Sequence, residues 1–282
     1  MHEFLQFAVY GILIGATYGL IAVPLGFAHT AFGIVDAAVG AYAALAGVVA
    51  VVVGGILGVV AGVGTGVAAS LVVAVVYRLL VKRRVADPII IIAATFGIGL
   101  AIQSIILTQF GKDPVIAQLF SRSWRVGAVF LNPQQLLDFL VGSLVVVVLL
   151  IVLYKTSIGR QIRAGADNTT GALLAGISVV RNQYLIFATE GLLAGAGGIL
   201  LAYTTGLDYT SVVTLTLNAF AAAVIFGMGG PLACFLGGIV IGFVESMVAG
   251  YVSNGVLTAG PYVFVILLLI FKRGSVVAGG RP

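Results

Sequence analysis

The chain has 282 residues, of which 61% are apolar and only 8% are charged, and its mean hydropathy is +1.22. Such a composition leaves too little polar surface to cover a water-soluble globule, so a soluble enzyme or soluble binding domain is excluded. A single cysteine, Cys234, excludes an intrachain disulfide and thiolate metal clusters, and the net charge of +5 comes without the basic and aromatic stretch that nucleic-acid binding needs.

We therefore predict an all-α, polytopic membrane protein with about eight or nine transmembrane helices, because one crossing needs about 20 apolar residues. The apolar runs predict nine spans with the amino terminus outside. The turn at 227–232 fits either two full crossings or two half-crossings. In chain order the spans are 5–27, 31–53, 56–80, 88–110, 137–154, 184–204, 213–229, 232–251 and 260–271.

The basic residues predict the orientation of these spans. Lys and Arg are retained on the cytoplasmic side of a membrane, and 11 of the 14 lie in three polar segments. Those segments and the carboxyl terminus should be cytoplasmic, while the loop 111–135 with Trp124 should be outside. The 11 residues are Arg78, Lys82, Arg83, Arg84, Lys155, Arg160, Arg163, Arg181, Lys272, Arg273 and Arg281.

Glycines recur every fourth residue in several spans, so each set lies along one helix face. In lipid, small residues at this spacing let two backbones approach closely. We expect tight packing within the chain, while a subunit interface or a sliding surface for a moving helix stays open. The sets are Gly11, Gly15 and Gly19; Gly54, Gly58, Gly62 and Gly66; Gly191 and Gly195; and Gly238 and Gly242.

The polar segment at about 155–183 is longer than a simple connection between two spans requires. Asp167 or Asn168 fits a helix amino-terminal cap, and Gly176 fits a terminator. The segment therefore predicts a short amphipathic helix whose leucines must be covered by the membrane surface or by a partner protein.

This segment resembles the cytoplasmic loop of permeases from branched-chain amino acid ABC importers, a group that includes urea permeases. The resemblance continues through "AGAGGILLAY" and "NAFAAAVIFGMGGPLACFLGGIVIGFVESM", and it covers about residues 10–273. In the loop, the residues that carry it are Gly159, Arg160, Arg163, Ala164, Asn168, Ala172, Leu174, Gly176 and Ile177.

The resemblance implies one permease domain over 1–282, located in the inner (plasma) membrane. It implies two cytoplasmic ABC ATPases, a second permease subunit that is a paralogue, and an extracytoplasmic solute-binding protein as partners. The chain has no GxxxxGK[ST] phosphate loop, so we expect it to hold no cofactor and ATP to bind to the partner subunits. By resemblance, the residues that couple to the ATPase are Gly159, Arg160, Arg163, Asn168, Ala172, Leu173, Leu174, Gly176 and Ile177.

Three carboxylic acids, Asp36, Glu190 and Glu245, fall inside apolar stretches. A carboxylate at the centre of a bilayer costs about 2.5 to 3.5 kcal/mol, so each should face the translocation path, a partner, or a structural bond to a neighbouring helix. The resembling family usually has Asn near position 36 and a small or hydroxyl residue at position 190. Other residues that could line the path, or simply bridge helices, are Tyr18, Tyr42, Gln103 and Asn218.

No catalytic constellation is predicted: the sequence offers no nucleophile with a base, no HExxH, no metal site and no paired acids at one site. The predicted function is the permease subunit of an ATP-driven importer for a small polar solute such as an amino acid, amide or urea. The alternative is an ion-coupled secondary transporter that uses Asp36, Glu190 or Glu245, and a passive channel is a third possibility.

Overall fold

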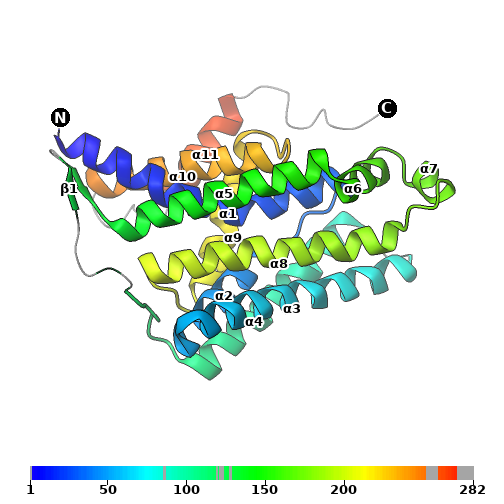
Figure 1. Ribbon diagram of the computed structural model, residues 1–282, viewed down its shortest axis with the longest axis horizontal. Coiled ribbons are helices and arrows are strands. Elements are labelled where there is room, and N and C mark those ends of the chain that lie inside the picture. The colour runs from blue at the N-terminus through cyan, green and yellow to red at the C-terminus, as the bar shows by residue number, and fades with distance from the viewer. Residues whose placement is uncertain are drawn as a thin grey trace.

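The computed structural model describes residues 2–84, 87–118, 120, 124–126, 129–251 and 260–271, and these form a bundle of long helices (Figure 1). The helices are α1 (His2–Phe32), α2 (Val39–Val53), α3 (Gly55–Lys82), α4 (Pro88–Phe110), α5 (Pro133–Lys155), α6 (Ser157–Asp167), α7 (Thr169–Leu174), α8 (Val179–Thr204), α9 (Ser211–Ile225), α10 (Pro231–Tyr251) and α11 (Gly260–Phe271). Two short antiparallel strands, β1 (Trp124–Val126) and β2 (Val129–Leu131), form a hairpin. The all-α prediction is confirmed.

Polar caps begin several of the long helices. The side chain of Asp87 accepts a hydrogen bond from the backbone N–H of Ile89, and that of Asn132 accepts one from Gln134, with Pro88 and Pro133 at the first helical positions. Such caps satisfy N–H groups that lack a partner inside the helix, and proline fits there because it has no N–H. The helices α4 and α5 therefore start where the sequence changes from polar to apolar.

Glycine faces bring the helices together. On α1, a Cβ at Gly15 would lie 2.7 Å from the Cα of Ile239 on α10, and one at Gly11 would lie 2.7 Å from the backbone of Phe243. On α3, a Cβ at Gly66 would lie 2.8 Å from the carbonyl of Gly191 on α8. The expected packing within the chain is confirmed for these sets, because only glycine permits these distances.

Gly54 does not belong to the packing set in which the sequence placed it. Its φ is +74°, a hypothetical Cβ there would have nothing within 4 Å, and it lies at the turn from α2 to α3. Glycine is favoured at this position because it adopts a left-handed conformation without steric cost.

Two of the predicted spans are shorter than expected. The helix α1 continues to Phe32, and a non-helical segment at 33–38, starting at Gly33 with a φ of +68° and ending in a turn, precedes α2. The span predicted at 31–53 is therefore wrong in its first part, and the span predicted at 213–229 ends at Ile225. Six helices in the described part of the chain are long and apolar enough to cross a membrane, while α2 and α9 are shorter apolar helices. The interruption at 33–38 places backbone polar groups inside the bundle, such as the buried N–H of Ala37.

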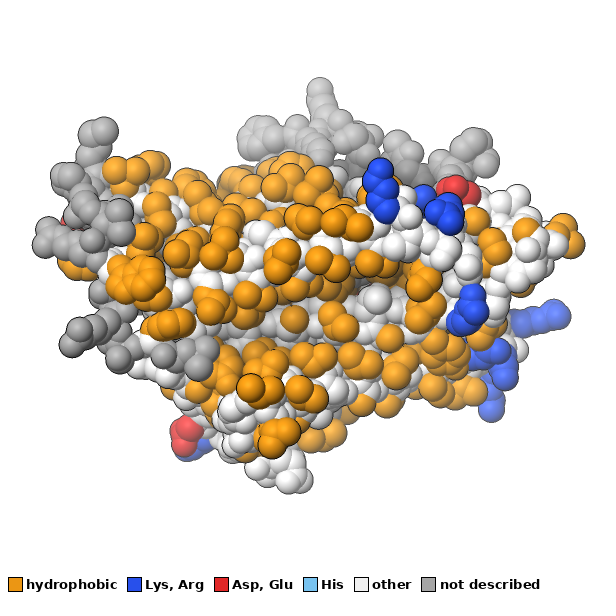
Figure 2. Space-filling view, in the orientation of Figure 1, with side chains coloured by type: hydrophobic (Ala, Val, Ile, Leu, Met, Phe, Trp, Pro, Cys, Tyr) orange, Lys and Arg blue, Asp and Glu red, His pale blue; other side chains and the backbone are white. Residues whose placement is uncertain are grey.

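The two ends of the bundle differ in charge and in structure. Eight basic side chains lie at the end that carries α6 and α7, which we call the basic end (Figures 1 and 2). The opposite end carries the hairpin, where the Gln6 side chain bonds to the backbone N–H and C=O of Phe130 at 2.8 and 2.9 Å. There Val115 and Leu207 also form an antiparallel bridge. The eight residues at the basic end are Arg78, Lys82, Arg83, Arg84, Lys155, Arg160, Arg163 and Arg181; Lys272, Arg273 and Arg281 lie outside the described residues.

Candidate functional site

The polar segment at the basic end folds as two short helices. Thr156 caps α6 by accepting a hydrogen bond from the N–H of Gly159, and Asn168 caps α7 by accepting one from Gly171. The predicted cap is thus Asn168 rather than Asp167, and Gly176, with a φ of +77°, follows α7 as the predicted terminator. The helix α6 was not predicted, although Thr156 supplies a capping side chain ahead of it.

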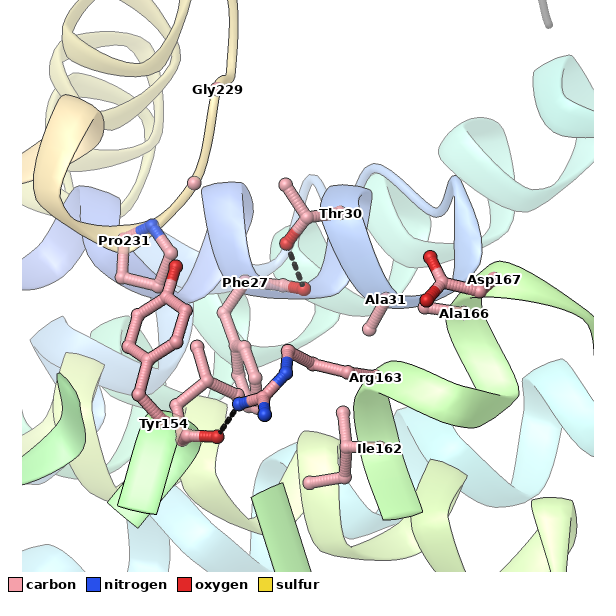
Figure 3. Close-up of a pocket in the computed structure, with 12 residues that line it drawn as sticks. Phe27, Thr30, Ala31, Tyr154, Ile162, Arg163, Ala166, Asp167, Gly229 and Pro231 are labelled. Carbon is pink, nitrogen blue, oxygen red and sulfur yellow. Dashed lines mark hydrogen bonds between the residues drawn. The ribbon is translucent and has the colours of Figure 1, made fainter. Parts of the chain in front are cut away.

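The helix α6 is attached firmly to the end of α5. Gly159 is buried against the carbonyls of Val152 and Leu153, where any larger residue would clash. The guanidinium of Arg163 donates a hydrogen bond to the Leu153 carbonyl and lies 5.1 Å from the centroid of the Tyr154 ring (Figure 3). This combination of a close backbone contact, a charged hydrogen bond and a cation–π contact fixes the angle between α5 and α6.

A second attachment joins α6 to α8. The Nη2 of Arg181, near the start of α8, donates to the Oε1 of Gln161 on α6 at 2.8 Å. On another side, α6 faces the end of α1 and the start of α10 across a cavity of about 190 Å³, with Thr30 and Pro231 on its far wall (Figure 3). The helix α6 is therefore tied directly to α5 and α8, and α7 follows it in the chain.

The helix α7 presents leucines outward. Leu173 is 57% exposed and Leu174 is 86% exposed, whereas Ala172 between them and the bundle is buried. Ile177 is half-buried, and the side chains of Arg160 and Asn168 are exposed. Two adjacent exposed leucines thus form a small apolar spot on α7, where the sequence predicted leucines that the membrane surface or a partner must cover.

Asp36 and Tyr42 meet at the interruption between α1 and α2. Asp36 is 1% exposed; its Oδ1 accepts a hydrogen bond from the N–H of Ala38 at 2.8 Å, and its Oδ2 accepts one from the hydroxyl of Tyr42 at 2.7 Å. The N–H of Ala37 donates to the Oγ1 of Thr95 on α4 at 3.0 Å. The non-helical segment at 33–38 therefore holds the Asp36 carboxyl inside the bundle by backbone and side-chain bonds.

Glu190, on α8, lies beside the same interruption. It is 1% exposed, its carboxyl group interacts with the Asp36 carboxyl, and its oxygens have no hydrogen-bond partner other than that carboxyl in the described structure. The expectation of no paired acids is therefore wrong: two carboxyl groups far apart in the sequence share one buried position. Helix packing brings them together, since α2 packs against α8.

The remaining path candidates lie apart from this pair. The hydroxyl of Tyr18 on α1 donates to the Oε1 of Glu245 on α10 at 3.3 Å, and the Oε2 of Glu245 has no described partner. Asn218 is buried on α9, and Gln103 is half-buried on α4 with its Oε1 unpartnered among the described residues. The seven residues predicted to line the path thus comprise the cluster of Asp36, Tyr42 and Glu190, one hydrogen-bonded pair on α1 and α10, and single residues on α4 and α9.

Asp138 is a buried acid that the sequence prediction did not include. It is almost completely buried on α5, where the Nε2 of Gln134 donates to its Oδ1 at 2.7 Å and the hydroxyl of Thr204 donates to its Oδ2. The predicted span began at 137, which placed Asp138 at a polar boundary. The spacing of Gln134 and Asp138 by one helical turn is the signal that could have identified it.

Comparison with known proteins places the chain in a family. A family model described as "Branched-chain amino acid transport system / permease component" matches residues 7–272. No solved structure gives a significant match.

Full-length relatives agree with this match. The high-affinity branched-chain amino acid transport system permease protein LivH of Escherichia coli is 26% identical over 298 residues, covering 99% of this chain and 96% of the relative. The corresponding protein BraD of Pseudomonas aeruginosa is 25% identical over 301 residues, covering 100% and 97%. The nucleoside ABC transporter permease protein NupC of Lactococcus lactis is 30% identical over 163 residues, covering 54% and 51%. The family resemblance is confirmed, and the chain belongs to the branched-chain amino acid ABC transporter permeases.

Proposed function

We propose that this chain is the membrane-spanning permease subunit of an ATP-driven importer. It moves a small polar solute, such as an amino acid, amide or urea, from an extracytoplasmic binding protein to the cytoplasm. Residues 1–282 act as one permease domain, and two cytoplasmic ABC ATPases and a second, paralogous permease subunit complete the transporter. The chain holds no cofactor, and ATP binds to the partner subunits.

One observation carries this proposal: the exposed leucine pair of α7 stands on a segment that is tied to two long helices. Leu173 and Leu174 supply an apolar contact for an ATPase groove, in the way an amphipathic helix binds a groove. The contact of Arg163 with Leu153 then transmits movement of α6 to α5, and the bond of Arg181 to Gln161 transmits it to α8. Gly159, Arg160, Asn168, Ala172, Gly176 and Ile177 shape or flank the same coupling surface.

The orientation follows from the charges. The basic end, with α6 and α7, faces the cytoplasm, as does the carboxyl terminus, and the hairpin end faces the binding protein. Within the bundle, Asp36, Tyr42 and Glu190 line the translocation path, with Tyr18, Gln103, Asn218 and Glu245 as further lining residues. The names of LivH and BraD point to branched-chain amino acids, whereas that of NupC points to nucleosides, so the solute is proposed only as small and polar.

The coupling surface is tested by cross-linking from α7. Because Cys234 is the only cysteine and is buried, Leu174→Cys creates a single exposed thiol in an otherwise native chain. A bifunctional thiol reagent in native membranes should join position 174 to a protein that carries a phosphate loop. Leu144→Cys, which exposes a thiol at a 63% exposed position in the middle of α5, is the control and should not be joined to it.

Transport provides the second measurement. A well-packed apolar side chain at an interface contributes about 2 kcal/mol or more, so Leu174→Asp should reduce ATP-driven uptake by about tenfold or more while leaving the chain folded in the membrane. Leu174→Met keeps an apolar contact and should retain uptake. Undiminished uptake by Leu174→Asp, or uptake by the isolated chain driven by an ion gradient, would reject the importer.

A further inference from the structure

A groove of about 330 Å³ lies between α5 and α8 on one face of the bundle. The helix α5 packs mainly against α1, whereas α8 packs mainly against α1, α2 and α3, so α5 and α8 touch each other little. Exposed side chains border the groove, such as Leu144 at 63% and Val148 at 50%, and the buried Leu149 and Leu193 are part of its floor. The surface of the bundle is therefore open along this line.

The groove is lined almost entirely by aliphatic side chains. Among the described residues that line it only Thr189 is polar, and its hydroxyl donates to the backbone carbonyl of Ile186 on the same helix at 2.7 Å. The other seven lining residues are Leu and Val. Contacts between membrane helices favour small residues, whereas lipid tails are as apolar as Leu. A hydrocarbon chain therefore matches this groove better than a helix of a second subunit does.

Exposed basic side chains stand at the end of the groove that faces the basic end. On α5, Lys155 follows the lining residue Val152 by three positions, so it lies on the same face one turn farther on. On α8, Arg181 precedes the lining residue Thr189 by about two turns along the same face. Figure 2 shows apolar side chains along the bands of α5 and α8, and basic side chains where both bands reach the basic end.

The side chain of Arg181 is held in place without being neutralised. Its Nη2 donates to the Oε1 of Gln161 on α6, and this amide oxygen carries no charge. A guanidinium has five N–H donors, so others remain for a phosphate. Between residues 139 and 189 the sequence has one acidic residue, Asp167, which lies at the opposite end of α6 from Lys155. The groove thus leads to a region of positive charge.

The length of the groove matches one half of a membrane. At about 1.5 Å per residue, its lining residues on α5 lie about 5 to 16 Å from Lys155, and those on α8 lie about 12 to 18 Å from Arg181. Half of a hydrocarbon layer about 30 Å thick is about 15 Å. The groove therefore has the reach of one acyl chain, measured from the level of the basic residues.

We propose that the α5–α8 groove and the basic residues at its end bind an anionic phospholipid. One acyl chain occupies the groove, and Lys155 and Arg181 bind the phosphate. Basic pockets beside membrane helices bind anionic headgroups, and long basic side chains reach the headgroups from the end of a helix. The assignment goes beyond the importer function and depends on no ATPase.

Photo-cross-linking of the purified full-length chain in phosphatidylcholine nanodiscs tests the assignment. Two probes, a phosphatidylglycerol and a phosphatidylcholine, carry the same diazirine in the same acyl chain, and mass spectrometry of the cleaved chain locates the labels. The phosphatidylglycerol probe should label 144–152 and 189–193 at least about fivefold more strongly, which is the factor that one basic residue near the surface supplies. Free glycerol phosphate should not displace this probe, because it has no acyl chain.

Matched variants separate the headgroup contact from the groove. Lys155→Gln should lower labelling by the phosphatidylglycerol probe about fivefold, whereas Lys82→Gln, which removes an exposed charge at the end of α3, should leave it unchanged. Val148→Phe fills the groove and should abolish labelling inside it. Val147→Phe, at an equally exposed position that does not line the groove, should keep the labelling.

Equal labelling by the two probes, displacement by glycerol phosphate, or full labelling of Lys155→Gln would overturn the assignment. Joining of Leu144→Cys to a second permease subunit by a bifunctional thiol reagent in native membranes would also overturn it, because a protein would then cover the groove. Cross-linking at position 174 reports on the ATPase and not on the lipid. Failure of the lipid site and failure of the importer are therefore distinguishable.

Discussion

The donors around a carboxylate decide how it behaves in this chain. Asp208, between α8 and α9, accepts hydrogen bonds from the hydroxyl of Thr210 at 2.7 and 2.9 Å and from the N–H and hydroxyl of Ser211 at 2.9 and 2.8 Å. Partial burial acts to raise the pKa of Asp208, but these donors outweigh burial and lower the pKa below its ordinary value. Its ionised form is therefore preferred in the folded state.

This preference predicts a pH-dependent contribution to stability. A carboxylate with a lowered folded-state pKa stabilises the protein above its unfolded pKa of about 3.9, and that stabilisation is lost as the pH falls through the folded pKa. Asp208→Ala should lower the unfolding temperature by about 1 to 3 °C at pH 7, in the range of a lost capping side chain. The difference from the native chain should shrink towards pH 3.

Asp113→Ala provides a control for this measurement, because Asp113 is an exposed carboxylate near the start of the connection after α4. It should change the unfolding temperature little at either pH. A loss in Asp208→Ala that is equally large at pH 3 would show that packing, and not the ionised carboxylate, supplies the stabilisation.

Residue type alone pointed to three residues that the structure brings together. Asp36, Tyr42 and Glu190 were identified because acids and tyrosines are unusual in apolar spans, and the structure places these three together. Their convergence could not be predicted, since it depends on which faces of α2 and α8 pack against each other. Whether they line a path stays a prediction.

At the scale of helices, the glycine periodicity predicted a packing face of α1, whereas the apolar runs missed an interruption. Every fourth residue on α1 is a glycine where it packs against α10, as the spacing predicts. By contrast, the run 31–53 reads as one span because its side chains are nearly all apolar. The interruption at 33–38 depends on backbone bonds such as that of Ala37 to Thr95, and hydropathy contains no information about such bonds.

The α1–α10 interface makes a direct prediction about substitutions. Gly15→Ala should destabilise the chain by about 1 to 3 kcal/mol, because its Cβ would lie 2.7 Å from the Cα of Ile239 and 2.8 Å from the Gly238 carbonyl, and overpacking forces the helices apart. Gly15→Leu should prevent recovery of a monodisperse protein. The measurements are thermal unfolding and size-exclusion chromatography in detergent.

Gly97 on α4 is the matched control. It is exposed, and a Cβ there would have nothing within 4 Å, so Gly97→Ala and Gly97→Leu should both be tolerated. Equal effects at positions 15 and 97 would mean that glycine acts through helix flexibility and not through close packing.

At the scale of the whole molecule, charge and structure are both asymmetric along the bundle. One end gathers Arg and Lys side chains around α6 and α7 (Figure 2), whereas the opposite end carries the hairpin that includes β1 (Figure 1). Arg163 and Arg181 also have a structural role, because their side-chain hydrogen bonds tie α6 to α5 and α8. These two residues therefore belong both to the charge asymmetry and to the attachment of α6.

This asymmetry predicts the orientation in the membrane. Basic segments are retained on the cytoplasmic side, so position 174 should be cytoplasmic and position 112 should be outside. Leu174→Cys and Lys112→Cys each add one exposed thiol to a chain whose native cysteine is buried. In intact cells that express the chain alone, a membrane-impermeant maleimide should label Lys112→Cys at once and Leu174→Cys only after the membrane is permeabilised. The reverse pattern would place α7 outside the cell, where no ATPase could reach its leucines, and would remove the physical basis for coupling.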